Sequence, residues 1–401
     1  MLKLLLSPLI SLFLFVLGNG LFTTLIILRL HEDQFSSIII GLMTSFFYVG
    51  LVIGSFRAEK FILRVGHIRA FSFFASLIAV VSLAQGIYVS SIFWLLMRLI
   101  GGFATAGLFI VIESWLLLLG DAKTRGKILA FYMIALYAAQ AMGQFLINLG
   151  NPSDLLLFAV VSMLSSLAVI PLSITKIGQP EIAEPASLNF MQLYKISSSG
   201  VIGCLCSGLI LGAIYGVLPL FLAKSLDSNK LVSFFMSLTI FGGMALQYPI
   251  GKLSDKLDRR IVLAVISFLA ALISIFSTLA FHHLWISGVV IFIFGGLTFT
   301  LYPASISHAC DNLSSEHMIS ATQGLLLTYS IGATIGPFIS PLFMTFLGAN
   351  GLFIYFFCIS AFLCTFFLWR KTQVPPTESE DQFVAIPNTT PVTAELDPRS
   401  E

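Results

Sequence analysis

Long apolar runs separated by short polar segments dominate the chain. A bilayer core of about 30 Å requires about 20 apolar residues in a helix, whereas a membrane-spanning strand needs about half as many and alternates in hydropathy. The pattern therefore predicts an all-α polytopic membrane protein with twelve transmembrane helices. The expected spans are 5–28, 36–56, 70–90, 92–119, 127–149, 154–175, 198–223, 231–250, 261–281, 285–309, 323–347 and 350–369.

The composition also indicates that lipid is the solvent. Hydrophobic residues make up 57% of the 401 residues and charged residues only 10%, against about 25% in soluble domains. The mean hydropathy is +0.98. These values exclude a soluble enzyme, a disordered protein and a nucleic-acid-binding protein. The five cysteines lack the paired spacing of a disulfide framework or a zinc site, so we expect no metal and no cofactor.

The distribution of basic residues predicts the orientation, because cytoplasmic loops carry an excess of Lys and Arg. With both termini inside, the outer loops carry only Arg29, Lys224 and Lys230, and Arg98 lies within a span. All other Lys and Arg residues then fall on the inner side. We therefore expect both termini to be cytoplasmic.

The chain is predicted to consist of two similar halves. Ile53-Gly54 matches Ile250-Gly251, and Gly101-Gly102 matches Gly295-Gly296, at a similar offset. Parallel repeats related by an axis along the membrane normal are typical of one transporter architecture. The expected domains are an N-terminal six-helix bundle (1–175), a cytoplasmic linker (176–196), a C-terminal six-helix bundle (197–371) and a disordered cytoplasmic tail (372–401).

The loop after the eighth span carries the most specific motif. It reads Gly251-Lys252-Leu253-Ser254-Asp255-Lys256-Leu257-Asp258-Arg259-Arg260. Gly251 allows close helix approach, Asp255 can cap a helix or pair with a cation, and Arg259 and Arg260 can bind carbonyls at a helix C-terminus. The alternative is a merely basic inner loop. The stretch resembles the loop signature of the major facilitator superfamily (MFS), in which it holds the inner gate closed in the outward-facing state.

The first-half counterpart departs from this signature, because no Asp stands four residues after Gly54. The inner gate is therefore expected to be asymmetric. Gly66-His67-Ile68-Arg69 and Ala394-Glu395-Leu396-Asp397-Pro398-Arg399 are similar to the bacterial YcaD-like group of MFS permeases. The resemblance covers essentially the whole chain. It implies an MFS fold of two pseudo-symmetric six-helix bundles.

Two charged residues lie within the predicted spans. Arg98 begins a pattern Arg98-x-x-Gly101-Gly102 that resembles the family's fourth-helix motif, whose Arg has been linked to proton transfer. The alternative is that Arg98 snorkels to the outer surface. Glu113 lies 15 residues further along, about 22 Å away on a helix, so the two cannot pair. Glu113 is either tied structurally to Arg125 or serves as a protonatable coupling site.

Small residues and prolines mark the eleventh span. Gly332, Gly336 and Pro337 resemble the fifth-helix motif of drug–proton antiporters, although they lie in the other half of the chain. Glycines four apart permit close helix contact, and Pro337 removes a backbone hydrogen bond and bends a helix. Helix packing alone is an equally good interpretation.

Polar side chains align on one face of the fifth span. Tyr137, Gln140, Gln144 and Asn148 are spaced by 3, 4 and 4 residues, which favours a cavity-facing stripe. In the superfamily, spans 1, 4, 5, 7, 8, 10 and 11 line the central cavity. Interhelical hydrogen bonding is the alternative for any single residue. The candidate cavity residues are Asn19, Arg98, Tyr137, Gln140, Gln144, Tyr215, Gln247 and Tyr302.

These features predict a secondary transporter of the bacterial inner (plasma) membrane that moves a small polar or anionic solute, with or without protons. It is expected to be a monomer embedded in the lipid bilayer, with no nucleic-acid partner. A drug-efflux antiporter and a non-transporting sensor are the alternatives; deletion of 372–401 should spare a transporter and silence a sensor. A membrane enzyme is not expected, because Glu113, His308 and His317 are too sparse for catalysis.

Overall fold

The computed structural model describes residues 2–120, 124–175, 193–194, 197–226, 228–280, 283–311, 315–373 and 382–399. Within these ranges, twelve helical segments are long and apolar enough to cross a membrane, which confirms the predicted all-α polytopic fold. The first half contains α1 (Leu2–Glu32), α2 (Ser37–Val65), α3 (His67–Ile87), α4 (Ser91–Leu119), α5 (Arg125–Phe145), the 3₁₀ helix η1 (Leu146–Leu149), α6 (Leu155–Leu167) and α7 (Val169–Ser173). The second half contains α9 (Ser198–Ser225), α10 (Asn229–Ser254), α11 (Arg259–Ala280), α12 (Leu284–Cys310), α13 (Ser315–Leu347), α14 (Gly351–Gln373) and the 3₁₀ helix η2 (Pro391–Leu396).

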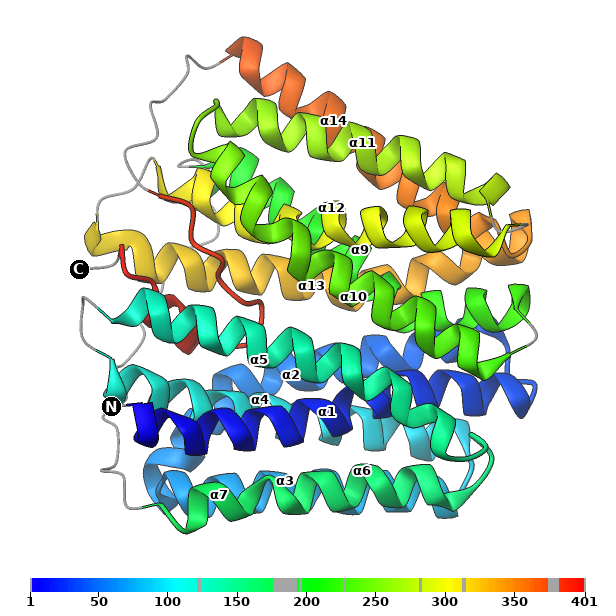
Figure 1. The fold of residues 1–401 in the computed structure, drawn as a ribbon, viewed down its shortest axis with the longest axis vertical. Helices are drawn as coiled ribbons and strands as arrows, with labels where there is room; N and C mark the ends of the chain where they lie inside the picture. Colours follow the sequence, from blue (N-terminus) through cyan, green and yellow to red (C-terminus); the bar gives the residue numbers. More distant parts are fainter. Residues whose placement is uncertain are drawn as a thin grey trace.

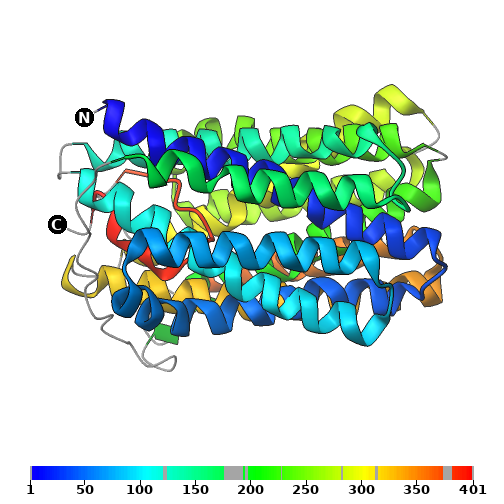
Figure 2. The same ribbon diagram turned by 90° about the horizontal axis from the view of Figure 1, so that it is seen from below.

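The helices form two bundles that lie side by side, with α1–α7 in one and α9–α14 in the other (Figure 1). In the first bundle α1 packs on α5, α2 on α4 and α3 on α6; in the second, α9 packs on α13, α10 on α12 and α11 on α14. The same pairing in each half makes the bundles pseudo-symmetric. Both chain termini lie at one end of the molecule (Figures 1 and 2). This end is called the termini end below, and the opposite end is called the distal end.

The repeated glycines predicted from the sequence bring paired helices into backbone contact. A Cβ atom on Gly102 of α4 would lie 2.0 Å from the Phe47 carbonyl oxygen of α2. In the second bundle, a Cβ atom on Gly295 of α12 would lie 2.0 Å from the Thr239 carbonyl oxygen of α10. Helices in lipid associate largely through such close van der Waals packing, because the apolar solvent provides no hydrophobic drive between them.

Adjacent glycines in α4 should respond differently to substitution. We expect Gly102→Ala to destabilise the protein by about 1–3 kcal/mol, since the added methyl group must push α2 away. Gly101→Ala should be nearly neutral, because its Cβ atom would meet nothing nearer than Val81 Cγ1 at 3.6 Å. Thermal unfolding of the two detergent-purified variants measures the difference. Equal melting temperatures would contradict the close α2–α4 contact.

Large apolar side chains cover much of the outside of the bundles. Exposed examples come from helices of both halves, including Ile134 of α5, Met163 of α6 and Phe268 of α11. Trp285, at the start of α12, is 88% exposed. In water such a surface would drive aggregation, whereas in a bilayer it contacts lipid. The exposed surface therefore agrees with a multi-pass membrane protein.

The prediction of a disordered tail is wrong for residues 382–399. This segment returns from the end of α14 to lie between the two bundles at the termini end (Figures 1 and 2), and it forms η2 there. Its apolar residues Ile386, Val392 and Leu396 are buried. The prediction of disorder was based on the polar composition of the whole tail, and these three apolar residues are too few to change that composition. Residues 374–381 lie outside the described residues, as does nearly all of the predicted linker 176–196.

Candidate functional site

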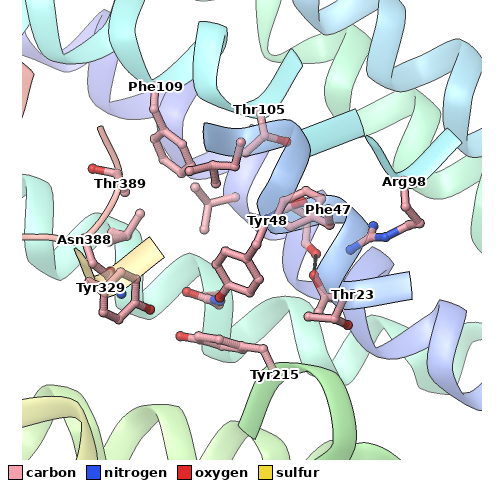
Figure 3. Close-up of a pocket in the computed structure, with 16 residues that line it drawn as sticks. Thr23, Phe47, Tyr48, Arg98, Thr105, Phe109, Tyr215, Tyr329, Asn388 and Thr389 are labelled. Carbon is pink, nitrogen blue, oxygen red and sulfur yellow. Dashed lines mark hydrogen bonds between the residues drawn. The ribbon is translucent and has the colours of Figure 1, made fainter. Parts of the chain in front are cut away.

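A cavity lies between the two bundles at mid-height (Figure 3). Helices α1, α2, α4 and α5 provide most of its wall, α9 and α13 provide one tyrosine each, and the tail provides the rest. Its polar and aromatic lining distinguishes it from the apolar exterior. The lining residues are Val16, Asn19, Thr23, Thr44, Phe47, Tyr48, Leu51, Arg98, Thr105, Phe109, Leu136, Gln140, Tyr215, Tyr329, Asn388 and Thr389.

Direct contacts between the bundles close the distal side of this cavity. A Cβ atom on Gly41 of α2 would lie 2.0 Å from the carbonyl oxygen of Pro337 in α13. At the same end, Lys224 Nζ donates to Ser37 Oγ at 3.0 Å. The pathway is therefore sealed toward the distal end by backbone packing and hydrogen bonds across the two halves.

Asn148 of η1 and Ser233 of α10 make a further contact across the halves at the distal end. Asn148 Nδ2 donates to Ser233 Oγ at 3.1 Å. Because η1 continues α5, this bond joins the end of the predicted polar stripe to the opposite bundle. The contact adds to the distal closure and does not line the cavity.

Arg98 is a buried cation that faces the cavity. Its side chain is only 2% exposed, and its guanidinium carbon lies 4.4 Å from the Phe47 ring centroid and 5.6 Å from that of Phe22. Its Nε makes a long hydrogen bond of 3.4 Å to the Met43 carbonyl oxygen. In the described part of the chain, no carboxylate forms a salt bridge with Arg98. Snorkelling to the surface is excluded by this burial, and the charge remains available to a ligand in the cavity.

Glu113 is fully buried near the termini end of α4, and hydroxyl groups surround it. Tyr132 donates to Oε1 at 2.6 Å, Thr389 donates to the same oxygen at 2.5 Å, and Thr390 donates to Oε2. The sequence-based alternative of a tie to Arg125 is wrong, because the described partners of Glu113 are these three hydroxyls. Two of them come from the tail.

Four of the eight candidate cavity residues line the cavity: Asn19, Arg98, Gln140 and Tyr215. The other four are buried in helix contacts. The Tyr137 ring packs 5.9 Å from that of Phe299, and the Tyr302 ring lies 4.8 Å from that of Tyr329. Gln247 of α10 is 5% exposed and lies away from the cavity lining.

Gln144 shows why the polar stripe of α5 predicted the cavity residues only in part. Its side chain accepts a hydrogen bond from Thr24 at 2.6 Å and donates to the Gly20 carbonyl oxygen at 3.0 Å, so it joins α5 to α1. Of the stripe, Gln140 faces the cavity, and its neighbours one turn away on either side serve helix packing. The stripe does face the interior of the molecule, as expected for uncharged polar groups in lipid.

The motif between α10 and α11 forms a charged cluster at the termini end. Arg259 Nη1 lies 3.0 Å from Asp311 Oδ1 and Arg259 Nη2 lies 3.4 Å from Asp255 Oδ1, so this side chain ties the loop to the end of α12. Arg260 pairs with Asp258 at 3.2 Å. Burial alone would raise the pKa of Asp258, but the hydrogen bonds and charge of Arg260 outweigh it and lower that pKa.

Gly251 and Asp255 of the same motif contact the tail. A Cβ atom on Gly251 would lie 2.2 Å from Phe383 Cδ1, so the glycine leaves room for the Phe383 ring. Asp255 Oδ1 accepts a hydrogen bond of 2.6 Å from the Phe383 backbone N–H. The close neighbour expected for Gly251 is thus the tail of the same chain.

The small residues of the eleventh span, α13, face two different partners. Cβ atoms on Gly332 and Gly336 would lie 2.1 and 2.2 Å from the carbonyl oxygens of Leu205 and Leu209 in α9. Pro337 instead approaches α2 across the two halves, through Gly41. The glycines therefore pack α13 within its own bundle, and their role in helix bending stays a prediction.

Sequence reasoning missed several cavity residues. Tyr48 and Thr44 line the cavity one helical turn apart on α2, and that spacing was a usable signal. Tyr329 of α13 lies between Thr328 and Ser330, but the residues one helical turn away from it, at 325, 326, 332 and 333, are apolar or glycine, so no polar stripe marks its face. Asn388 and Thr389 could not be predicted as cavity residues, because no feature of the neighbouring sequence places the tail inside the molecule.

The family comparison matches almost all of the chain. The Major Facilitator Superfamily matches residues 9–325 and 200–394. The chain is 30% identical over 368 residues to an "Uncharacterized MFS-type transporter YcaD" from Escherichia coli O17:K52:H18 (strain UMN026 / ExPEC), covering 91% of this chain and 95% of the relative. A relative of the same name from Shigella flexneri matches to the same extent.

Solved transporter structures share the fold. The nucleoside transporter NupG superimposes with a TM-score of 0.73 at 17% identity, over 91% of this chain and 98% of that one. A bacterial homologue of the human lysosomal transporter Spinster, in an inward-facing and unoccupied conformation, gives a TM-score of 0.73 at 15% identity, over 92% and 96% of the chains. At these identities the likeness concerns the fold alone.

Proposed function

Because the chain belongs to the Major Facilitator Superfamily, and is a membrane transporter by that membership, we propose that it moves a small solute across the bacterial inner membrane by alternating access. The observation that carries the proposal is the Arg98-lined cavity between two pseudo-symmetric bundles. A site at the interface of two repeats can be exposed to each side in turn when the bundles rock against each other. The protein acts as a monomer in this proposal, because one chain contributes both walls.

The arrangement of contacts supports an inward-facing state. The bundles touch at the distal end, through Gly41 and Pro337 and through Lys224 and Ser37, while the tail lies between them at the termini end. If the termini are cytoplasmic, as the basic residues predict, the closed end faces outward.

The chemistry of the cavity supports a solute with an anionic group and polar or aromatic parts. Arg98 offers a guanidinium that lacks a carboxylate partner within the described residues, and such a group binds carboxylates or phosphates through paired hydrogen bonds. Tyr48, Tyr215 and Tyr329 add hydroxyls and ring faces. A carboxylated metabolite with a ring or a polar chain fits this lining.

Glu113 supports coupling to protons. It is a fully buried carboxyl group with hydroxyl partners and no described basic partner, and one of those partners, Thr389, lines the cavity. A carboxyl group inside a membrane that is paired only with neutral groups is a candidate for proton binding and release. Loss of its proton leaves a charge that needs solvation, and the solvation of the group changes as the bundles move. Transport would then run with a proton gradient.

Efflux of toxic compounds is the second candidate function. The aromatic walls provided by Phe47, Phe109 and the cavity tyrosines favour it, since flat apolar compounds stack on such rings. The buried charge of Arg98 favours the anionic metabolite. Whether the solute is imported or exported depends on the solute and on the ion or solute gradient that drives transport, and flux measurements in both directions distinguish the two.

A two-step experiment tests the proposal. Purified protein is screened by thermal shift against a panel of carboxylated, phosphorylated, neutral polyhydroxylated and cationic aromatic solutes. Each solute that raises the melting temperature is then measured for uptake into liposomes with and without a proton gradient. We expect anionic solutes to stabilise the protein and to be taken up. Absence of protein-dependent flux for every stabilising solute would overturn the transporter mechanism.

A further inference from the structure

The chain's own tail lies between the two bundles at the termini end (Figures 1 and 2). Residues 382–399 cross from the loop after α10 to the interior face of α4, and η2 lies against α4, α5 and α13. Ile386 is 1% exposed and Leu396 is fully buried. The segment thus has the burial of a core element, although it follows the last membrane span.

The tail contacts the second bundle through its first residues. Asp255, in the loop after α10, accepts the 2.6 Å hydrogen bond from the Phe383 backbone N–H. The Phe383 ring covers Gly251, where any side chain larger than hydrogen would collide with it. The superfamily loop motif is therefore engaged by the tail in this conformation.

The tail contacts the first bundle through two consecutive threonines. Thr389 donates to Glu113 Oε1 and Thr390 to Oε2, so one carboxyl group receives a hydroxyl on each oxygen. Tyr132 completes the cluster by donating to Oε1, and it lies 3.2 Å from the Thr389 hydroxyl. The positions involved are 276 and 277 residues apart in the chain.

The tail also forms one wall of the cavity. Asn388 and Thr389 face the cavity that Arg98 faces from the other side (Figure 3). A solute moving from the cavity to the termini end would meet these two residues first. The segment therefore stands on the path between the cavity and that end.

The docked segment is held in shape by its own side chains. Asp397 is fully buried and pairs with Arg399 at 2.7 Å, while the Thr393 hydroxyl donates to the Thr390 carbonyl oxygen at 2.7 Å. These bonds fix the turn that presents the two threonines to Glu113. A segment whose conformation is already fixed by internal hydrogen bonds and ion pairs loses less conformational entropy when it docks.

We propose that the facing surfaces of the two bundles at the termini end form a peptide-binding site and that residues 382–399 are its tethered ligand, a plug that must leave before the bundles can close there. The inference rests on the proposed alternating-access function. In that cycle the outward-facing state brings the bundles together at the termini end. A segment wedged between Asp255 of one bundle and Glu113 of the other prevents that closure. Docking of the plug therefore holds the transporter in the inward-facing state.

Glu395 is a partly buried carboxyl group of η2, which packs against α4, α5 and α13, so its protonation state bears on docking. Burial raises its pKa above the ordinary value, Glu59 of α2 raises it further, and Arg125 of α5 opposes them. The docked tail therefore binds a proton more tightly than the free tail, so docking is strongest at low pH and weakens as pH rises through the raised pKa. We expect Glu395→Gln to keep the plug docked at high pH, and thiol labelling of the tail measures it.

Thiol protection in full-length protein tests the plug without any solute. In a background with Ser in place of the native cysteines, Val392→Cys should react slowly with a membrane-impermeant maleimide, since Val392 is 8% exposed, while Gln382→Cys, at an exposed tail position, should react fast. Adding Thr389→Ala and Thr390→Ala removes both hydroxyls from Glu113 and should speed Val392→Cys labelling about tenfold or more. The Gln382→Cys rate should not change and serves as the reference at each pH.

Flux through the same variants in liposomes completes the test. Release of the plug in the Thr389→Ala, Thr390→Ala protein should raise the rate of uptake severalfold over the parent. Unchanged labelling of Val392→Cys would overturn the plug itself, whether or not the protein transports. Faster labelling with unchanged or reduced flux would overturn its role in the cycle. Absence of flux in all variants, parent included, would instead count against the proposed function and leave the docking result standing.

Discussion

Arg98→Ala should abolish uptake of an anionic solute while leaving the protein folded. Loss of a buried, hydrogen-bonded cation from a charge pair costs about 2–5 kcal/mol, which corresponds to roughly 30- to 5,000-fold weaker binding. The fold should survive, because Arg98 contributes one long hydrogen bond and two ring contacts to its surroundings. Uptake into liposomes and the thermal shift given by the solute measure the two effects separately.

Arg98→Lys is the matched control for the charge. Lysine keeps the positive charge but lacks the planar fork that pairs two hydrogen bonds with one carboxylate. We expect it to retain weak binding and slow uptake, between the parent and Arg98→Ala. Full activity in Arg98→Ala, with an unchanged solute affinity, would remove Arg98 from the binding site.

Glu113→Gln should uncouple transport from the proton gradient. The amide keeps the size of the carboxyl group and one accepting oxygen, although its nitrogen cannot accept the Thr390 hydroxyl. Because it cannot exchange a proton, solute exchange between the two sides should persist. Accumulation against a gradient should fall to the equilibrium level. Parallel measurement of exchange and of proton-driven uptake in the same liposomes separates these outcomes.

Glu113→Asp is the companion variant, because it keeps a titratable group one methylene shorter. We expect partial coupling in it. Proton-driven accumulation in Glu113→Gln equal to that of the parent would show that Glu113 only anchors the tail through Thr389 and Thr390. Val392→Cys labelling would then change with the substitution, whereas the proton-driven accumulation ratio would not.

The tail changes what its deletion means. On sequence alone, loss of residues 372–401 was expected to leave a transporter unaffected and to silence a sensor. With residues 382–399 lodged between the bundles, a transporter freed of them should instead run faster. A non-transporting sensor would show no flux before or after the deletion and would lose its output, so a rise in flux identifies the transporter.

The fold was predictable because its determinants are local. Each membrane span is a run of apolar residues long enough to be recognised by itself. The glycine pairs at 101–102 and 295–296 repeat at matching places, and one glycine of each pair is in backbone contact with the neighbouring helix. The cavity was predictable in part. Arg98 and Gln140 were found because a charge or amide within a span must face the interior.

The remaining site residues depend on tertiary contacts that the sequence does not encode locally. Gln144 has the same spacing as Gln140, yet Thr24 and the Gly20 carbonyl oxygen draw it into the α1–α5 contact. Glu113 was given Arg125 as a partner because that residue lies nearby in sequence. Its actual partners Thr389 and Thr390 follow the last span, in a segment whose polar composition hid Ile386 and Leu396.

Reversible locking of the distal end tests alternating access most directly. Lys224 Nζ and Ser37 Oγ are 3.0 Å apart across the two bundles. In the Ser37→Cys, Lys224→Cys protein the thiol at 224 ends three bonds short of the Nζ position, so the two thiols face each other across a short gap. A short bifunctional methanethiosulfonate reagent should join them, stop solute uptake and release it again on reduction, whereas the single-cysteine proteins should be unaffected. Uptake at the parent rate in the cross-linked protein would contradict rocking of the two bundles around a central site.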